Sequence, residues 1–125
     1  MTKRILVVED QEDNRTILRD LLGMAGYELI EATNGAEGIE LALREKPDLI
    51  LMDIQLPLID GYEATRRIKE NADLKATPIV AVTSYALSGD EAKARAAGCD
   101  AYVTKPFSPR ELLAKVRQYL PSEKS

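Results

Sequence analysis

The 125-residue chain has no histidine, no tryptophan and a single cysteine, Cys99. The lack of histidine excludes a histidine kinase or a histidine phosphotransfer protein, because that side chain is their phosphoryl carrier. One cysteine cannot build a disulfide framework and is compatible with a reducing compartment such as the cytoplasm. Because Cys99 has no histidine to activate it, we expect a buried structural residue rather than a nucleophile.

Long hydrophobic runs and an excess of positive charge are also missing. No run approaches the roughly 20 apolar residues needed to cross a bilayer, and the N-terminus shows no signal-peptide cleavage pattern. The formal net charge of −4 argues against a nucleic-acid binder, which normally shows a basic face. We therefore expect a cytoplasmic protein that spans no membrane and does not bind nucleic acid directly.

Four short apolar runs each end on a reactive polar residue. The runs span residues 5–8, 49–52, 79–82 and 101–104, and they lead into Glu9-Asp10, Asp53, Thr83 and Lys105. Uninterrupted Val, Ile and Leu are typical of parallel strands that are covered on both faces of a sheet. Because ligands bind outside the carboxyl ends of such strands, we expect these polar residues to meet at one rim.

The segments between the apolar runs have helical periodicity. Helices are predicted over residues 14–24, 36–45, 62–70, 88–97 and 108–120, and an acid-interrupted edge strand over 27–32. The predicted buried faces are Ile17, Leu18, Leu21 and Leu22 in the first helix and Ile39, Ala42 and Leu43 in the second. Ser88 and Ser108 are the expected N-caps of the last two helices, and Pro109 suits the first helical position.

This alternation predicts an α/β fold of five βα units. The expected architecture is a doubly wound, five-stranded parallel sheet with helices on both faces and strand order 2-1-3-4-5. Residues 1–120 would form one domain, and residues 121–125 a frayed tail. The strand order places the Glu9-Asp10 strand end beside Asp53.

Carboxylates crowded at one rim repel each other and are costly to desolvate unless a cation neutralises them. A few hard oxygen ligands, without cysteine or histidine, suit Mg²⁺, which often bridges to phosphate. The sequence therefore predicts a Mg²⁺ site at Glu9, Asp10 and Asp53.

Lys105 and Thr83 complete the predicted site. Lys105 precedes Pro106, which orients the local backbone and permits a cis peptide bond at modest cost. A divalent cation, a lysine and a hydroxyl around one carboxylate can hold a dianionic phosphoryl group. Asp53 would then be a nucleophile that forms an aspartyl phosphate, with no general base required because the carboxylate is already ionised.

Together these residues resemble the receiver domain of bacterial two-component response regulators, over essentially the whole chain. The motifs that carry the resemblance are Val8-Glu9-Asp10, Met52-Asp53-Ile54-Gln55-Leu56-Pro57 with Asp60-Gly61, Val82-Thr83-Ser84 and Lys105-Pro106. Single-domain receivers of this kind are similar to chemotaxis regulators and to DivK-type cell-cycle regulators. A receiver module of a hybrid histidine kinase would show the same motifs in its sequence.

The resemblance implies a role for each site residue. Asp53 would be the phosphoacceptor. Asp10, Asp53 and the main-chain carbonyl of Gln55 would bind Mg²⁺ directly, and Glu9 would bind it through water. Lys105 would pair with the phosphoryl group, and Thr83 would donate a hydrogen bond to it.

The resemblance also implies a switch and a means of tuning it. Tyr102 would turn inward when Thr83 moves, which repacks the face made by the fourth helix, the fifth strand and the fifth helix. Gln55 and Tyr85 would flank the route of an attacking water and tune the lifetime of the phosphoryl group.

The implied function is a phospho-accepting regulator in a two-component system or phosphorelay. The phosphodonor histidine must come from a sensor kinase or a phosphotransfer protein, and the output must pass through contact with a downstream protein. Such a domain assists its own phosphorylation and dephosphorylation and is not a turnover enzyme.

Two rivals of other classes share parts of this pattern. A Mg²⁺-dependent phosphatase of the haloacid dehalogenase type needs a second aspartate two places after the nucleophile, where this chain has Gln55. A flavodoxin-like FMN carrier needs a phosphate-cradling loop after the first strand, where residues 9–13 hold four acids. A receiver-like module that never accepts phosphate is disfavoured because every expected site residue is present.

Overall fold

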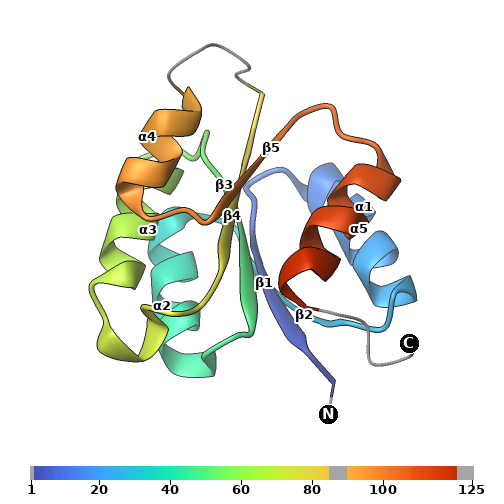
Figure 1. Ribbon diagram of the computed structural model, residues 1–125, viewed down its shortest axis with the longest axis horizontal. Helices are drawn as coiled ribbons and strands as arrows, with labels where there is room; N and C mark the ends of the chain where they lie inside the picture. The colour runs from blue at the N-terminus through green and yellow to red at the C-terminus, as the bar shows by residue number, and fades with distance from the viewer. Residues whose placement is uncertain (1, 85–89, 121–125) are drawn as a thin grey trace.

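The computed structural model of the protein describes residues 2–84 and 90–120 (Figure 1). Strands and helices alternate along the chain, as the sequence predicts. The elements are β1 Arg4–Val8, α1 Glu12–Met24, β2 Glu28–Ala32, α2 Gly35–Glu45, β3 Leu49–Asp53, α3 Gly61–Lys69, a short 3₁₀ helix η1 Ala72–Leu74, β4 Ile79–Thr83, α4 Asp90–Ala97, β5 Ala101–Thr104 and α5 Pro109–Tyr119.

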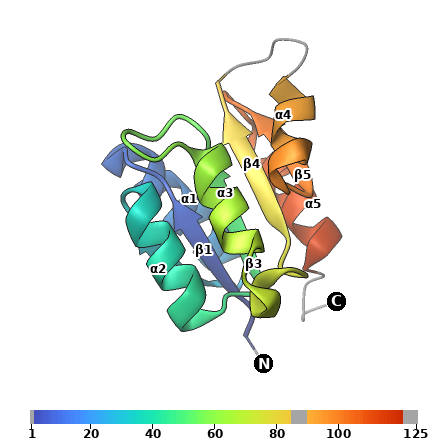
Figure 2. The ribbon, with the colours of Figure 1, turned by 90° about the vertical axis from the view of Figure 1, so that its left-hand side faces the viewer.

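The five strands form one parallel sheet in the order β2-β1-β3-β4-β5. Helices α1 and α5 cover one face of the sheet, and α2, α3 and α4 cover the other (Figures 1 and 2). Each strand contributes side chains to two hydrophobic clusters, one against each helical layer. The predicted doubly wound fold and its strand order are therefore confirmed.

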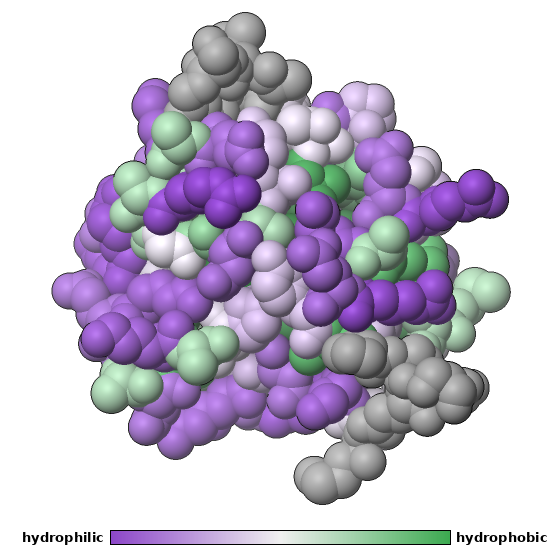
Figure 3. Space-filling view, in the orientation of Figure 1, coloured by the Kyte–Doolittle hydropathy of each residue, from purple (hydrophilic) through white to green (hydrophobic). Residues whose placement is uncertain are grey.

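Burial across the sheet follows the composition of the strands. Every residue of β3 and β4 is buried, whereas in β2 only Ala32 is. The acids Glu28 and Glu31 in β2 are tolerated because the strand lies at the edge of the sheet, where a side chain can reach solvent. The outer surface seen in Figure 3 is mostly hydrophilic.

Two residues predicted on buried helix faces are in fact exposed. Leu43 is 40% exposed because α2 packs on the sheet through its small residues. A Cβ atom at Gly38 would lie 2.8 Å from Cγ2 of Val8, so the helix axis comes close to β1 and Leu43 is turned to the side. Ile17 is 54% exposed because it lies in the first part of α1, beside the cavity described below.

The ends of the helices agree with the predicted bounds in some places and differ in others. Helix α1 begins at Glu12, two residues earlier than predicted. Ser108 caps α5 by accepting a hydrogen bond from the Glu111 N–H at 3.0 Å, with Pro109 at the start of the helix as predicted. Cys99 is buried, as predicted.

Two of the sequence predictions about local structure concern residues that the structure leaves undescribed. The Ser88 cap lies outside the described residues, as does the tail at 121–125. Within the described part of the chain, no helix combines the length and apolar character that crossing a bilayer requires.

Candidate functional site

The carboxyl ends of β1, β3, β4 and β5 bring the predicted polar residues to one rim of the sheet. Val8 pairs with Met52, so the next residues, Glu9 and Asp53, leave their strands side by side. On the other side Asp53 pairs with Val82, and Thr83 pairs with Thr104. The register of the strands therefore brings these residues to one rim of the sheet.

Three carboxylates form the acidic side of this rim. Oxygens of Glu9, Asp10 and Asp53 lie within 4.8 Å of one another. Glu9 and Asp53 are 2% and 4% exposed, while Asp10 is half-buried. Burial at such short separation is unfavourable for ionised groups unless positive charge or hydrogen-bond donors compensate it.

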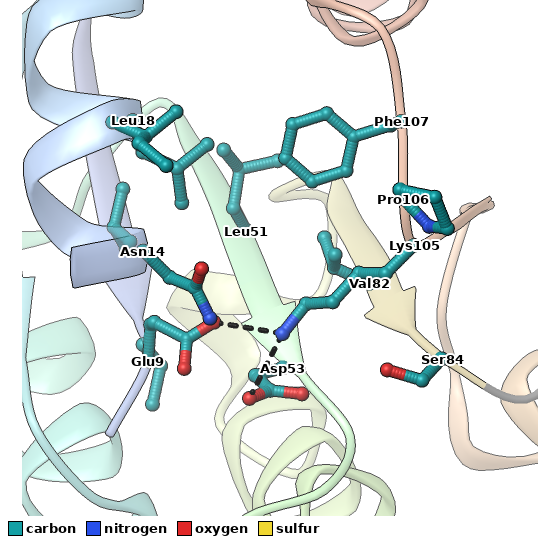
Figure 4. Close-up of a pocket in the computed structure, with 13 residues that line it drawn as sticks. Glu9, Asn14, Leu18, Leu51, Asp53, Val82, Ser84, Lys105, Pro106 and Phe107 are labelled. Atoms are coloured by element: carbon teal, nitrogen blue, oxygen red, sulfur yellow. Dashed lines mark hydrogen bonds and ion pairs between the residues drawn. The ribbon is translucent and has the colours of Figure 1, made fainter. Parts of the chain in front are cut away.

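Lys105 supplies positive charge from the opposite side of the rim. Its Nζ lies 2.9 Å from Oε1 of Glu9 and 3.5 Å from Oδ2 of Asp53 (Figure 4). The peptide bond between Lys105 and Pro106 is cis, as the sequence permits. Burial lowers the pKa of Lys105, but the Glu9 hydrogen bond and the Asp53 charge outweigh it, so the pKa lies above its usual value. The lysine is therefore held as an ammonium ion.

Backbone donors hold the two buried carboxylates in place. The Gln11 N–H donates to Oε2 of Glu9 at 3.0 Å, and the Gln55 N–H donates to Oδ1 of Asp53 at 3.0 Å. Arg15 donates to the main-chain carbonyl of Glu9 at 2.9 Å. One lysine still faces three carboxylates, so the cluster retains an excess of negative charge that a hard divalent cation would neutralise.

Thr83 and Tyr102 lie on the β4–β5 side of the site. Thr83 is fully buried at the end of β4, and its carbonyl accepts a hydrogen bond from the Lys105 N–H at 2.6 Å. Tyr102 is half-buried and packs against the hydrophobic cluster under α2, α3 and α4. The structure thus brings Thr83 to the site residues and leaves Tyr102 one strand away, paired with Ala81.

Gln55 and Ser84 form a contact that the sequence did not predict. Oε1 of Gln55 accepts a hydrogen bond from the backbone N–H of Ser84 at 2.9 Å. This links the loop after Asp53 to the end of β4. Tyr85, which was expected to act with Gln55, lies outside the described residues.

A cavity of about 430 Å³ opens beside the acidic cluster. Asp53, Glu9 and Lys105 line its polar end, and Asn14 faces them from α1 (Figure 4). Its other walls are largely apolar: Ile17, Leu18, Leu51, Pro106 and Phe107. The sequence analysis did not predict this apolar wall, because it assigned Ile17 to the hydrophobic core. The one signal in the sequence that could have indicated the wall is the position of Ile17 near the ends of the strands.

The arrangement suits chemistry at an anionic group. Asp53 presents an ionisable oxygen at the mouth of a cavity, with a fixed ammonium ion beside it and two further carboxylates that can share a cation. Positive charge around a carboxylate nucleophile is what a transferring phosphoryl group requires.

Comparison with known proteins points to the same chemistry. Residues 5–117 match the response regulator receiver domain. The chain is 44% identical over 120 residues to the polar-differentiation response regulator DivK of Brucella anthropi, covering 96% of this chain and 98% of that protein.

Solved structures agree in fold. The chemotaxis protein CheY4 of Vibrio cholerae superposes with a TM-score of 0.91 at 27% identity, covering 95% of this chain and 99% of that one. The receiver domain of the sensor histidine kinase PA1611 from Pseudomonas aeruginosa PAO1 superposes with a TM-score of 0.89 at 36% identity, covering 98% and 100%. That structure has a magnesium ion coordinated in its active-site cleft. The chain therefore belongs to the response regulator receiver domain family and acts in phosphorelay signalling.

Proposed function

We propose that the chain receives a phosphoryl group on Asp53 from a phosphohistidine of a partner protein. The observation that carries this proposal is the buried Asp53 carboxylate, held by the Gln55 N–H at 3.0 Å and by Lys105 at 3.5 Å, at the mouth of an open cavity. The donor is a sensor histidine kinase or a histidine phosphotransfer protein, because the chain has no histidine of its own.

The transfer forms one bond and breaks one bond. An Asp53 carboxylate oxygen attacks phosphorus, the phosphorus–nitrogen bond to the partner's imidazole breaks, and the imidazole leaves with the bonding electron pair. Lys105 pairs with the phosphoryl oxygens, and Thr83 donates a hydrogen bond to one of them. No proton has to leave Asp53, so the site works by positioning and charge.

Mg²⁺ is the cation that best fits the donor set. Asp10, Asp53 and the main-chain carbonyl of Gln55 would hold it directly, and Glu9 through water. All of these ligands are hard oxygens, which Mg²⁺ prefers. When bound, the ion would neutralise charge on the phosphoryl oxygens.

The first experiment is intact-mass measurement after incubation with Mg²⁺ and acetyl phosphate. We expect a gain of one phosphoryl group that requires Mg²⁺ and disappears in Asp53→Asn. That variant keeps the size of the side chain and removes the ionised nucleophile. A phosphoryl gain that persists in Asp53→Asn contradicts the assignment, and no gain from either acetyl phosphate or a phosphorylated histidine partner contradicts the function.

Phosphorylation would then act through Thr83 and Tyr102. The phosphoryl group carries about two negative charges at neutral pH, in place of the single charge of the Asp53 carboxylate. These charges draw the Thr83 hydroxyl and leave room for Tyr102 to turn inward. The face of α4, β5 and α5 is repacked and presents a new surface to a downstream protein. The output is protein contact and not enzymatic turnover, and we place this signalling in the cytoplasm, with residues 1–120 as the receiver domain.

Thr83→Ala tests this switch. The variant should still gain a phosphoryl group, because Asp53 and Lys105 are unchanged, but it should lose the coupling to the α4–β5–α5 face. Amide hydrogen exchange in β5 and α5, and the ring resonances of Tyr102, should change on phosphorylation in the parent and stay constant in the variant. Equal loss of phosphorylation and of the structural change would count against this role for Thr83.

Of the two alternative functions, one remains compatible with the comparisons and the other does not. A receiver module of a hybrid histidine kinase remains compatible with the match to the PA1611 receiver domain. The haloacid dehalogenase-type phosphatase finds no support: the side chain of Gln55 cannot exchange a proton as a general acid, and it is engaged with Ser84.

A further inference from the structure

Gln55 contacts both sides of the site through two different groups. Its backbone N–H donates to Oδ1 of Asp53 at 3.0 Å, while its side-chain carbonyl accepts from the Ser84 N–H at 2.9 Å. The second bond joins residues 29 positions apart. The loop after the acceptor aspartate is thus tied directly to the end of β4.

The Ser84 N–H is directed at the side chain of Gln55, in the loop that follows Asp53. Its acceptor belongs to the residue two places after Asp53, and Ser84 lines the same cavity as Asp53 and Lys105 (Figure 4). Ser84 also follows Thr83, the residue proposed to donate to the phosphoryl group. The Ser84 N–H and the Thr83 side chain therefore lie next to each other along the chain at the edge of the same site.

A phosphoryl group on Asp53 would bring three strong acceptor oxygens into this space. A hydrogen bond to such an anionic oxygen is roughly twice as strong as one to a neutral amide carbonyl. The Ser84 N–H can serve only one of these acceptors well. Phosphorylation therefore competes with Gln55 for the same donor.

We propose that the Gln55 side chain is a latch that occupies the Ser84 N–H in the resting protein and yields it to a phosphoryl oxygen when Asp53 is phosphorylated. This inference rests on the proposed function. The hydrogen bond from Ser84 to Gln55 makes phosphorylation less favourable, by about the free energy of one neutral hydrogen bond. It also links the state of Asp53 to the end of β4, because the exchange breaks the tie between the two loops.

Gln55→Met tests the latch, since methionine has a similar length and lacks the carbonyl acceptor. Two measurements are made with Mg²⁺ present. The first is the NMR shift and exchange rate of the Ser84 amide in the unphosphorylated protein. The second is the rate of phosphorylation by acetyl phosphate. Gln118→Met is the matched control, because Gln118 is exposed on α5 away from the Asp53 cavity.

In Gln55→Met we expect the Ser84 amide to shift and to exchange faster, and phosphorylation to be about two- to tenfold faster, as the loss of one neutral hydrogen bond predicts. Gln118→Met should match the parent in both. An unchanged Ser84 amide in Gln55→Met, or a phosphorylation rate no higher than that of the parent, overturns the latch. If the parent protein gains no phosphoryl group, the proposed function is wrong, and the transfer of the Ser84 hydrogen bond from Gln55 to a phosphoryl oxygen is wrong as well. The Ser84 amide, which needs no phosphate, still reports separately whether the resting contact exists.

Discussion

Gly61 shows at the level of one residue how closely the loop after Asp53 is packed. Its N–H donates to the carbonyl of Ile54 at 3.0 Å. A Cβ atom at this position would lie 2.6 Å from Cα of Ile54 and would also contact the main-chain carbonyl of Asp53. Because both contacts are with backbone, they cannot be relieved by turning a side chain. Glycine is therefore required for helix α3 to begin directly behind Asp53.

Gly61→Ala should destabilise the protein by about 1–3 kcal/mol, the usual cost of overpacking a tight site. Urea unfolding of the unphosphorylated protein measures this loss. Gly23→Ala is the control, because its Cβ would have nothing within 4 Å and Gly23 lies inside α1. That substitution should stabilise the protein by about 0.5–1 kcal/mol through helix propensity. Equal effects of the two substitutions would mean that the close approach at Gly61 is relieved at no cost.

At the scale of elements, α1 is attached to the edge strand β2 by a network of charges. Nε and Nη2 of Arg19 lie 2.7 and 2.8 Å from the two carboxylate oxygens of Glu31, a two-bond arrangement. Arg15 approaches the same carboxylate at 3.7 Å and also reaches the carbonyl of Glu9. The edge strand is thereby joined through α1 to the acidic end of the site.

The same contacts set the charge state of Glu31. The Arg19 hydrogen bond, opposed in part by burial, holds the pKa of Glu31 below its usual value. A lowered pKa means that the pair stabilises the fold at pH values above the unfolded pKa, about 4.3. That contribution is lost as the pH falls through the lower folded value.

Glu31→Gln should therefore cost about 0.5–1 kcal/mol at pH 7, the upper range for a partly exposed pair. The difference from the parent should begin to shrink as the pH falls below about 4.3, where the carboxylate of the unfolded parent binds a proton, and should vanish below the lower pKa of the folded protein. Urea unfolding across this pH range is the measurement. Glu28→Gln in the same strand is the control, since the ion pair of Glu28 with Arg4 is longer, at 3.8 Å, and the substitution should change stability less. A difference for Glu31→Gln that does not depend on pH would contradict the electrostatic origin.

At the scale of the whole molecule, the acidic site should couple cation binding to folding. The unfolded chain separates Asp53 from Glu9 and Asp10, so a cation that needs all three carboxylates binds only the folded state. Mg²⁺ should raise the thermal midpoint progressively, with a gain of about 2.7 kcal/mol at a concentration one hundred times the dissociation constant. Calorimetry with Mg²⁺, and with EDTA as the metal-free reference, measures this.

Two controls separate site binding from general screening. Sodium chloride at the same ionic strength should give a much smaller rise, because it only screens the carboxylates. Asp10→Asn should stabilise the metal-free protein and weaken the response to Mg²⁺, since it removes both a repulsive charge and a ligand. An equal response of parent and variant to Mg²⁺ would place the binding elsewhere.

Much of the site was predictable from the chain, for a topological reason. Parallel strands end at the same edge of a sheet, so Asp53, Thr83 and Lys105 had to meet once their apolar runs were recognised as strands. The helices were predictable in place but not in orientation. Ile17 and Leu43 were assigned to buried faces by periodicity and are exposed, because periodicity does not specify how a helix is rotated or how far it extends over the sheet.

The sequence by itself determined the alternating α/β order, the burial of the central strands and the identity of the acidic residues at the rim. These follow from local composition and from the general geometry of parallel sheets. Only the tertiary structure decided the close packing of α2 at Gly38, the apolar wall of the cavity and the bond from Gln55 to Ser84. Each of these depends on distances between segments far apart in the chain, and such distances are set by the packing of whole elements rather than by the residues beside them.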